Sequence, residues 1–231
     1  MKNKMKTPYL MATLRFILFL LLVLGGCIFY AFYGKTLRAS ELTEADKYAA
    51  IAMVKGVVDK TFSFVLDPKN SMKKKIDLLK ENLISKVDFN FVSPFVLGSI
   101  NKSMDENNKA KFRSLFSDLM LYSYTSKFSS YENYVAEVLD TEDVSDKGQL
   151  YVNFIVYKKD NKNSTKVNCK VRMRKSGDAF KVVDMNIAGV SMAITYRSEF
   201  KSLIDSAKAN GEDAIKKLFD TLSSKVKGYK G

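Results

Sequence analysis

The sequence contains no histidine, and this absence restricts its chemistry more than any other. Without histidine the chain has no Ser-His-Asp or Cys-His arrangement, no imidazole ligand for zinc and no imidazole base near neutral pH. Glycine-rich phosphate loops of the GxGxxG or Walker A type are also missing. We therefore predict a protein that is not an enzyme and uses no cofactor.

Cysteine is scarce as well, with Cys27 and Cys169 as the only two. This number excludes a cysteine-rich metal site and, if the N-terminal segment is removed, an internal disulfide. Cys169 lies in VNCKVRM between alternating apolar residues, so we expect a small buried hydrophobic side chain there. The acidic residues Asp140, Asp143 and Asp146 lack the spacing and terminal glutamate of an EF-hand, so a solvated loop is favoured over a metal site.

One carboxylate has an unusual position in the sequence. Asp184 lies in the middle of the strand-like segment FKVVDMNI, where a buried acid would indicate catalysis. The same residue would be ordinary on the solvent side of a bulged strand. We favour the second interpretation.

Positive charge is in excess, at +13, but it is unevenly distributed. Residues 1–39 carry six lysines or arginines and no acid, which leaves +7 for the rest of the chain. There the lysines alternate with aspartate and glutamate and do not form the stripe that a nucleic-acid surface requires. We therefore expect an ordinary solvated surface and no nucleic-acid partner.

The N-terminal segment has the order of an export signal or of a membrane anchor. Basic residues precede an uncharged run of 18 residues, Phe16 to Tyr33. We predict that residues 1–39 are a signal peptide or an N-terminal membrane anchor and that residues 40–231 form the folded domain. The chain should accordingly be exported or attached to a membrane.

Three fates of this segment remain open. Gly26 before Cys27 fits a lipid-attachment signal, although the apolar IFYAFY that follows does not. A signal peptidase would cut best after Ala39, where Leu37 at the −3 position is unfavourable. An uncleaved anchor is the third alternative, because 18 residues just reach the length that spans a bilayer. Cleavage that leaves Ser40 as the first residue is the outcome we favour.

Between residues 43 and 128 the apolar residues recur at steps of three and four, which predicts helices. The first runs from Thr43 until Asp67-Pro68 stops it, and the second begins at Ser71. A third, short helix covers Phe91 to Ile100 and is kinked at Pro94.

A long helix is predicted next. It opens at Ser103, three residues before Glu106, which is the spacing of a capping box, and it continues toward Phe128. Two further helices, at about 191–208 and 213–227, are predicted at the end of the chain.

After Tyr131 the apolar period changes from 3.6 to two, which predicts strands. Four such segments follow, separated by turn-forming residues: YENYVAEVL, QLYVNFIVYK, KVNCKVRMRK and AFKVVDMNI. The fourth changes parity between Val182 and Val183, which indicates a bulge. We therefore predict an α+β fold, with a four-stranded antiparallel sheet packed against a set of helices.

Strand parity also predicts which side chains share a space. Alternate residues of the second and third strands should face the helices, and the predicted group is Val152, Phe154, Val171 and Met173 with Phe116, Met120 and Tyr196. Such a group can fill a core or line a cavity for an apolar ligand, and composition does not distinguish the two.

Two segments carry a resemblance to a known family. The segment Phe180 to Leu218 contains Val183-Asp184, Gly189-Val190-Ser191-Met192, Tyr196-Arg197, Phe200 and Gly211 at characteristic spacing. The segment Phe95 to Asn133 contains Leu97-Gly98, Phe112, Phe116, Met120, Tyr124, Phe128 and Tyr131. In order and spacing, both resemble the MlaC or toluene-tolerance family of periplasmic phospholipid-binding ABC-transport proteins.

The resemblance implies a periplasmic carrier of a Gram-negative bacterium that holds a diacyl glycerophospholipid in an apolar cavity between sheet and helices. It implies a monomer that shuttles lipid between an inner-membrane ABC transporter complex and an outer-membrane lipoprotein complex of the Mla type, which maintains outer-membrane lipid asymmetry. Together with strand parity it gives this lipid-binding set: Phe95, Phe112, Phe116, Met120, Phe128, Tyr131, Val152, Phe154, Val171, Met173, Met185, Val190, Met192 and Tyr196.

A second interpretation uses the same elements without a lipid. The aromatic and aliphatic stripes could pack into a filled core, and the apolar N-terminal run could hold the domain at a membrane. The chain would then be a membrane-tethered, non-enzymatic binding or assembly module.

Overall fold

The computed structural model describes residues 42–65, 67–125, 133–144, 148–160 and 165–230. The chain from Leu42 to Gly231 forms one compact unit. The predicted leader, residues 1–39, lies outside the described residues, as do Phe128 and Tyr131. Within the described ranges, no helix combines the length and the apolar character needed to cross a membrane.

The first described helix, α2 (Glu44–Lys60), follows Thr43, the residue from which the sequence predicted a helix, and Thr43 is its cap. The Thr43 hydroxyl accepts a hydrogen bond from the backbone N–H of Asp46 (3.2 Å), and the Asp46 carboxylate accepts one from the backbone N–H of Thr43 (3.0 Å). This reciprocal pair satisfies backbone donors that the first helical turn leaves free. The chain continues as the π-helix Thr61–Val65 and then turns at Pro68, as predicted.

The next helices confirm most of the predicted pattern. α3 (Met72–Asn82) is capped by Ser71, and α4 (Phe89–Leu97) contains Pro94. The 3₁₀ turns Ile84–Lys86 and Gly98–Ser103 follow α3 and α4.

The start of α5 (Glu106–Thr125) corrects one prediction. Ser103 ends a 3₁₀ turn and does not cap the helix. The cap is Asp105, whose carboxylate accepts a hydrogen bond from the backbone N–H of Asn108 at 2.7 Å. The 3₁₀ turn, which the spacing of residues does not reveal, moves the helix start two positions along the chain.

The sheet is an antiparallel meander in which each strand pairs with the next along the chain. Its strands are β1 (Tyr134–Val144), β2 (Gln149–Lys158), β3 (Val167–Ser176), β4 (Ala179–Ile187) and β5 (Val190–Ser191). The sequence predicted four strands, and β5 is a fifth, because a strand of two residues is too short to show a period of two.

The predicted bulge in β4 is confirmed. Met173 of β3 pairs with Val182, whereas the preceding Arg172 pairs with Asp184, so Val183 is the extra residue. A bulge of this kind bends the strand and increases its twist. β4 contacts α6 (Met192–Ala209), and both α6 and the last helix, α7 (Ala214–Lys230), agree with the prediction.

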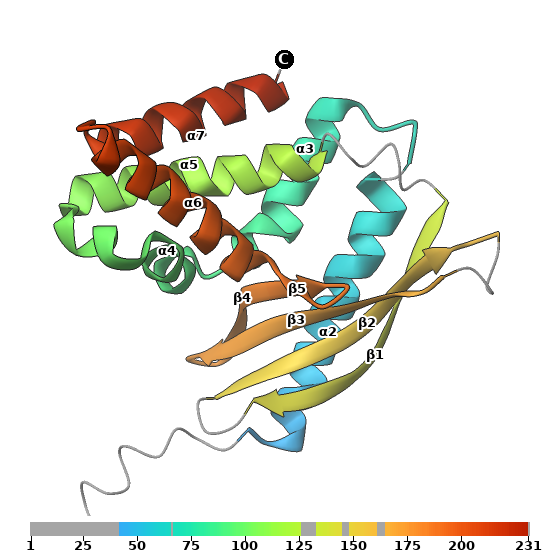
Figure 1. Ribbon diagram of the computed structural model, residues 1–231. Coiled ribbons are helices and arrows are strands. Elements are labelled where there is room, and N and C mark those ends of the chain that lie inside the picture. Colours follow the sequence, from blue (N-terminus) through green and yellow to red (C-terminus); the bar gives the residue numbers. More distant parts are fainter. Residues whose placement is uncertain (1–41, 66, 126–132, 145–147, 161–164, 231) are drawn as a thin grey trace, which may run out of the picture. The chain divides into compact units, whose positions relative to one another are not determined.

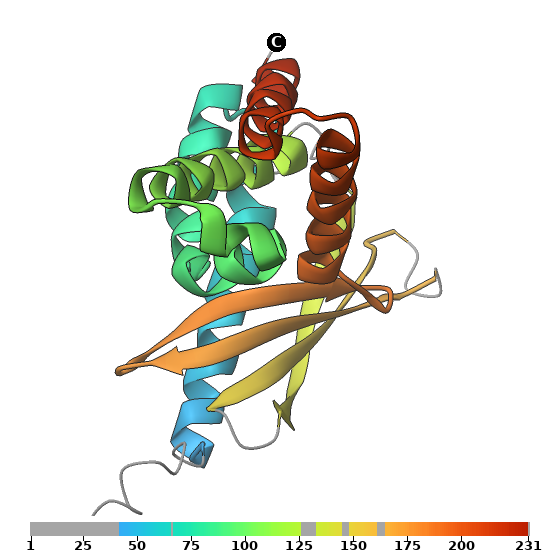
Figure 2. The same cartoon turned by 60° about the vertical axis from the view of Figure 1, so that its left-hand side comes forward.

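The helices divide between two places relative to the sheet. α2 lies against one face of the sheet, whereas α4 to α7 gather beyond β4 and β5 (Figures 1 and 2). α6 starts directly after β5, and α5 packs against α7.

This division produces separate hydrophobic clusters. The helical cluster consists of Val92, Val96, Leu97, Ile100, Met104, Phe112, Phe116, Leu119, Val183, Phe200, Ile204, Ala207, Ala214, Leu218, Phe219, Leu222 and Val226. The sheet cluster lies between α2 and the sheet and consists of Ala50, Val54, Leu150, Val152, Phe154, Cys169, Val171, Met173 and Phe180.

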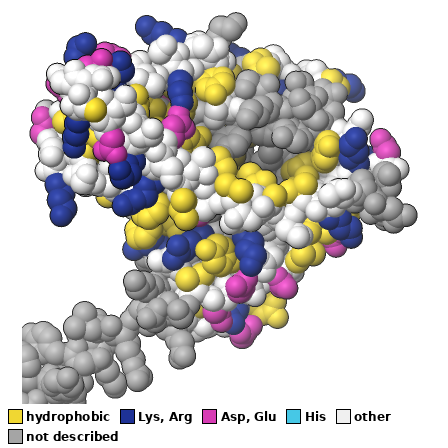
Figure 3. Space-filling view, viewed as in Figure 1, with side chains coloured by type: hydrophobic (Ala, Val, Ile, Leu, Met, Phe, Trp, Pro, Cys, Tyr) yellow, Lys and Arg dark blue, Asp and Glu magenta, His cyan; other side chains and the backbone are white. Residues whose placement is uncertain are grey.

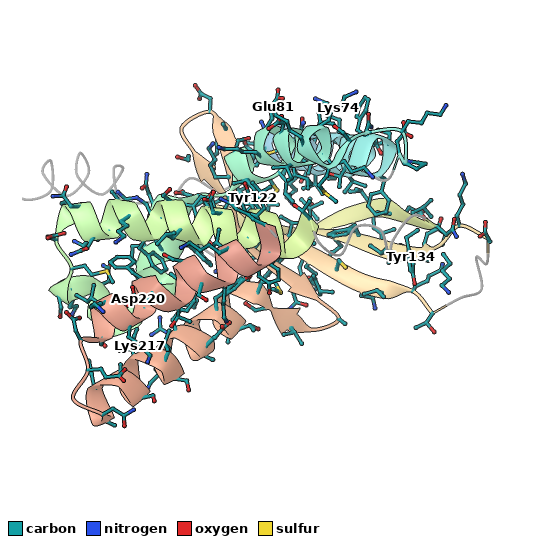
Figure 4. All side chains as sticks on the ribbon, turned by 90° about the horizontal axis from the view of Figure 1, so that it is seen from above. Lys74, Glu81, Tyr122, Tyr134, Lys217 and Asp220 are labelled. Atoms are coloured by element: carbon teal, nitrogen blue, oxygen red, sulfur yellow. The ribbon has the colours of Figure 1, made fainter. Side chains whose placement is uncertain are left out.

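A small third cluster joins α3 to α5. It contains Leu79, Ile84 and Leu121, and Tyr122 packs against it. Figure 4 shows Tyr122 between α5 and α3, whereas Lys74 and Glu81 lie on the outer side of α3. The amphipathic pattern of α3 is thus explained by an apolar side that packs in this cluster and a charged side that faces outward.

Candidate functional site

A pocket of about 500 Å³ opens on the face of the sheet that is turned away from α2. Parts of α4, β5, the start of α6 and the middle strands of the sheet enclose it. Its lining residues are Phe91, Val92, Phe95, Tyr151, Arg172, Val183, Asp184, Asn186, Gly189, Val190, Ser191, Ala193, Ile194 and Thr195. The volume falls within the usual range for small-molecule sites, roughly 300–1,000 Å³.

The rim of the pocket is apolar and exposed. Phe91 and Phe95 of α4 are each 41% exposed, Val190 is 57% exposed and Ile194 is 58% exposed. Figure 3 shows hydrophobic side chains across the middle of this face, between the helices and the sheet, with lysine and arginine side chains beside them. Large apolar side chains that gather in this way on a surface mark a binding site more often than isolated ones do.

Two arginines hold the aromatic part of the rim. The Arg174 guanidinium lies 4.7 Å from the Phe91 ring centroid, and that of Arg197 lies 4.8 Å from the Phe95 ring centroid. Arg174 also pairs with Asp88 at 3.1 Å, and Arg197 donates a hydrogen bond to the backbone oxygen of Phe95. These cation–π contacts keep both rings in place while leaving part of each exposed.

The floor of the pocket is polar. Tyr151 of β2, Arg172 of β3 and Asp184 and Asn186 of β4 point to this side of the sheet, because alternate residues of each strand face away from α2. The pocket therefore combines an apolar rim with a floor that carries one basic and one acidic side chain.

Asp184 connects the sheet to α6. Its carboxylate accepts hydrogen bonds from the backbone N–H of Met185 (2.8 Å), the hydroxyl of Ser191 (2.5 Å) and the backbone N–H of Ala193 (2.9 Å). The bulge at Val183 places Asp184 on the side of the strand that the sequence predicted, which here faces the pocket, and Asp184 is half-buried there. A carboxylate at a helix N-terminus is a favourable electrostatic arrangement, so the role of Asp184 here is to anchor α6.

The arginine of the floor has a different environment. Arg172 Nε is buried and has no hydrogen-bond partner among the described residues. The Arg172 guanidinium lies 6.0 Å from the Tyr151 ring centroid. Within the described part of the chain no ion pair of Arg172 is found, although its neighbours Lys170 and Arg174 pair with Glu142 and Asp88.

The site contains little that could perform covalent chemistry. No group of histidine, cysteine, aspartate or glutamate within the described ranges is arranged to hold a metal ion. Cys169 is buried in the sheet cluster, and burial raises the pKa of its thiol to about 11, so it remains a neutral thiol near pH 7. Asp140 and Asp143 lie in β1 and not in the loop that the sequence predicted, where they bind Asn153 and Lys47 respectively. Asp146 lies outside the described residues. The arrangement is suited to binding an amphipathic molecule.

The structure does not bring the predicted lipid-binding residues into one space. Phe112 and Phe116 belong to the helical cluster, where Met120 and Tyr196 pack against them, and the Phe116 and Tyr196 ring centroids are 5.0 Å apart. The other group is under α2, in the sheet cluster or packed against it: Val152, Phe154, Val171, Met173 and Met185.

The remaining predicted residues lie elsewhere. Phe95 and Val190 line the pocket. Met192 is the half-buried first residue of α6. Phe128 and Tyr131 are outside the described residues.

Sequence reasoning missed Phe91, Tyr151, Arg172 and Ile194 as pocket residues. One feature of the sequence indicated a site here: β2 is apolar on both faces, with Val152 and Phe154 on one face and Tyr151 and Ile155 on the other. A strand with two apolar faces indicates that something covers the second face.

Known proteins resemble the chain in sequence and in fold. A family model described as "MlaC protein" matches residues 55–223. Among solved structures, a phospholipid-binding protein from Ralstonia solanacearum, determined in complex with a phospholipid, is similar with a TM-score of 0.65. The sequence identity is 20%, and the similarity covers 79% of this chain and 99% of that one. No match was found among curated proteins.

Proposed function

The chain belongs to the MlaC family, and from this membership we propose that it is a periplasmic phospholipid carrier. It would take a diacyl glycerophospholipid from one membrane complex, shield the acyl chains from water and release the lipid to another complex. No covalent step is required, which agrees with the absence of histidine from the sequence. The similarity in fold to a phospholipid-binding protein supports the proposal.

The observation that carries the proposal is the amphipathic pocket. Two 16-carbon chains contain about 30 methylenes, and at about 0.8 kcal/mol each their exposure to water would cost roughly 24 kcal/mol. A carrier therefore has to cover most of this surface. An apolar rim beside a polar floor would bind the chains and leave a separate place for the charged end of the lipid.

The inner wall of the pocket suggests the path of the chains. Val92 and Val183 line the pocket and also belong to the helical cluster, and Ala193 lies beside them at 9% exposure. Chains that enter between α4 and α6 would therefore extend toward Phe116 and its neighbours. The pocket would widen if these helices separate.

We place the carrier in the periplasm of a Gram-negative bacterium, released from its leader near Ser40 or held at the inner membrane if the leader remains. Its partners would be an inner-membrane ABC transporter complex and an outer-membrane lipoprotein complex of the Mla type. As a monomer that shuttles between them, it would serve outer-membrane lipid asymmetry. The basic-then-apolar order of residues 1–39, which is typical of an export signal or a membrane anchor, and the family membership support this placement.

Intact mass measurement under native conditions tests the proposal most directly. The protein is exported in a Gram-negative host, recovered from the periplasmic fraction and weighed before and after denaturation. We expect an additional mass of one diacyl phospholipid in the native spectrum and the same lipid in an organic extract. A stable protein that carries no lipid, and that acquires none from vesicles, would contradict the proposal.

The packing also supports a second candidate function, that of a module with a filled core. Val152 and Met173 are fully buried under α2, and Phe116 is 1% exposed among the helices, as in a filled core. A membrane-tethered, non-enzymatic binding or assembly module would have such a core and no lipid. The same mass measurement decides between the two, because this module remains empty and folded.

A further inference from the structure

We propose that Arg172 binds the phosphate of the carried lipid, so that the pocket selects diacyl lipids with a phosphate over those without one. This inference rests on the proposed carrier function and extends it to the headgroup end of the ligand. It assigns a role to the polar floor of the pocket, which acyl chains alone do not need.

Arg172 differs from the nearby arginines in its environment. Arg174 has a carboxylate partner in Asp88, and Arg197 has the backbone oxygen of Phe95. Arg172 Nε is buried and has no acceptor among the described residues, although it lies in the lining of the pocket. A buried donor that has lost its hydrogen bonds to water and found no acceptor destabilises the protein, so an acceptor supplied by the ligand would restore the missing hydrogen bond.

Asp184 is the acid that faces Arg172 across β3 and β4. The Asp184 carboxylate already accepts hydrogen bonds from Met185, Ser191 and Ala193, and it lies at the N-terminus of α6. Its charge is therefore engaged by the helix, and within the described residues it forms no ion pair with Arg172. The positive charge of Arg172 remains available to an anion in the pocket.

A guanidinium presents its donors in a planar fork that matches the oxygens of a phosphate, and charge-assisted hydrogen bonds of this kind are about twice as strong as neutral ones. The Tyr151 ring beside Arg172 limits the positions that the fork can take. Phosphatidylethanolamine and phosphatidylglycerol both carry the phosphodiester, so the site would accept either and would reject diacylglycerol.

The test is a competition between two lipids that have the same chains. The protein is expressed from the full-length sequence and exported by the host. It is then incubated with vesicles that contain dioleoylphosphatidylglycerol and dioleoylglycerol in equal amounts, and the bound lipids are counted by mass spectrometry. Wild type should prefer the phospholipid by roughly ten- to a hundredfold, as hydrogen bonds to a charged group imply. Arg172→Gln should lower this preference to near unity while diacylglycerol still binds.

A matched control removes a positive charge from the same face of the same strand. Lys170 lies two residues from Arg172 and does not line the pocket, and its ammonium pairs with Glu142 at 2.5 Å. Lys170→Gln should therefore keep the wild-type preference. If Lys170→Gln and Arg172→Gln lower it equally, general attraction to an anionic vesicle explains the result and the inference is wrong.

The remaining outcomes separate the inference from the proposed function. A wild type that binds neither lipid disproves the carrier function itself. A carrier in which Arg172→Gln retains the wild-type preference disproves only the role of Arg172. Should Arg172→Gln fail to fold, Arg172→Lys decides: it keeps the charge but loses the fork, so an unchanged preference would overturn the inference and a several-fold decrease would support it.

Discussion

At the scale of single residues, Cys169 illustrates how burial controls chemistry. It lies in the sheet cluster between α2 and β3, with Val171 and Phe154 in the same cluster. Removal from water disfavours the thiolate, which raises the pKa of the thiol from an ordinary 9.0 to about 11. At a pH between these two values, the folded protein therefore keeps the Cys169 proton and the unfolded chain loses it.

This difference predicts how stability depends on alkaline pH. Between about pH 9 and pH 11 the unfolded chain loses the Cys169 proton and the folded protein retains it, so the free energy of unfolding should decrease as the pH rises. Urea denaturation at pH 8, 9 and 10 measures the decrease. Cys169→Ala lacks the thiol, so its free energy of unfolding should decrease less over the same pH range. Equal slopes for the two proteins would mean that the thiol is not desolvated.

At the scale of elements, the junction between β4 and α6 depends on Asp184. Replacement by alanine leaves two backbone donors and the Ser191 hydroxyl without their acceptor. We expect Asp184→Ala to lower the free energy of unfolding by about 1–3 kcal/mol.

Asp184→Asn is the control for this prediction. The amide keeps one oxygen, which can still accept from Met185 and Ala193, so the loss should be smaller than for alanine. Chemical denaturation measures the free energy of unfolding of the three proteins, which should decrease from wild type to Asp184→Asn to Asp184→Ala. If asparagine and alanine are equally destabilising, the charge at the helix N-terminus contributes more than the hydrogen bonds do.

The elements themselves could be predicted because each carries a local signal. Thr43, Ser71 and Pro68 mark helix ends, and the parity change at Val182 marks the bulge. These local signals failed for elements that are too short to show a repeating pattern of apolar residues. β5 has two residues, and the 3₁₀ turn Gly98–Ser103 displaces the start of α5.

The pocket could not be predicted in the same way. Its residues come from α4, the middle of the sheet and the start of α6, which are separated by up to about a hundred positions in the sequence. Parity separates the two faces of a strand correctly, but it does not say which helices cover which face. The predicted grouping of Met173 with Phe116 requires all the helices to cover one face of the sheet, whereas α2 is the described helix that covers that face and Phe116 lies in the separate helical cluster.

At the scale of the whole molecule, the fate of residues 1–39 decides how far the domain can travel. We predict that the exported product begins near Ser40, since the compact domain starts at Leu42 and its first described helix is capped by Thr43. N-terminal sequencing of the periplasmic protein determines the first residue. A product that begins at an acylated Cys27, or a protein that remains in the membrane fraction with Met1 intact, would show that the domain is tethered.

The location of the acyl chains can be tested by comparing the rim of the pocket with the sheet cluster. Val190 and Ile194 are largely exposed, so Val190→Ala and Ile194→Ala should change the free energy of unfolding by no more than about 0.5 kcal/mol. Together they remove apolar surface from the rim, and the double variant should retain several-fold less lipid. Lipid extraction and thermal unfolding of the same sample measure both quantities.

Met173→Ala is the opposite case. Met173 is fully buried under α2, so its truncation leaves a cavity and should lower the free energy of unfolding by about 2–5 kcal/mol. The amount of lipid per folded molecule should nevertheless stay at the wild-type level, because the pocket lies on the other face of the sheet. If instead Met173→Ala loses its lipid and the Val190→Ala/Ile194→Ala variant keeps it, the chains lie between α2 and the sheet. The helix α2 would then have to move away from Val152 and Met173 whenever a lipid is loaded.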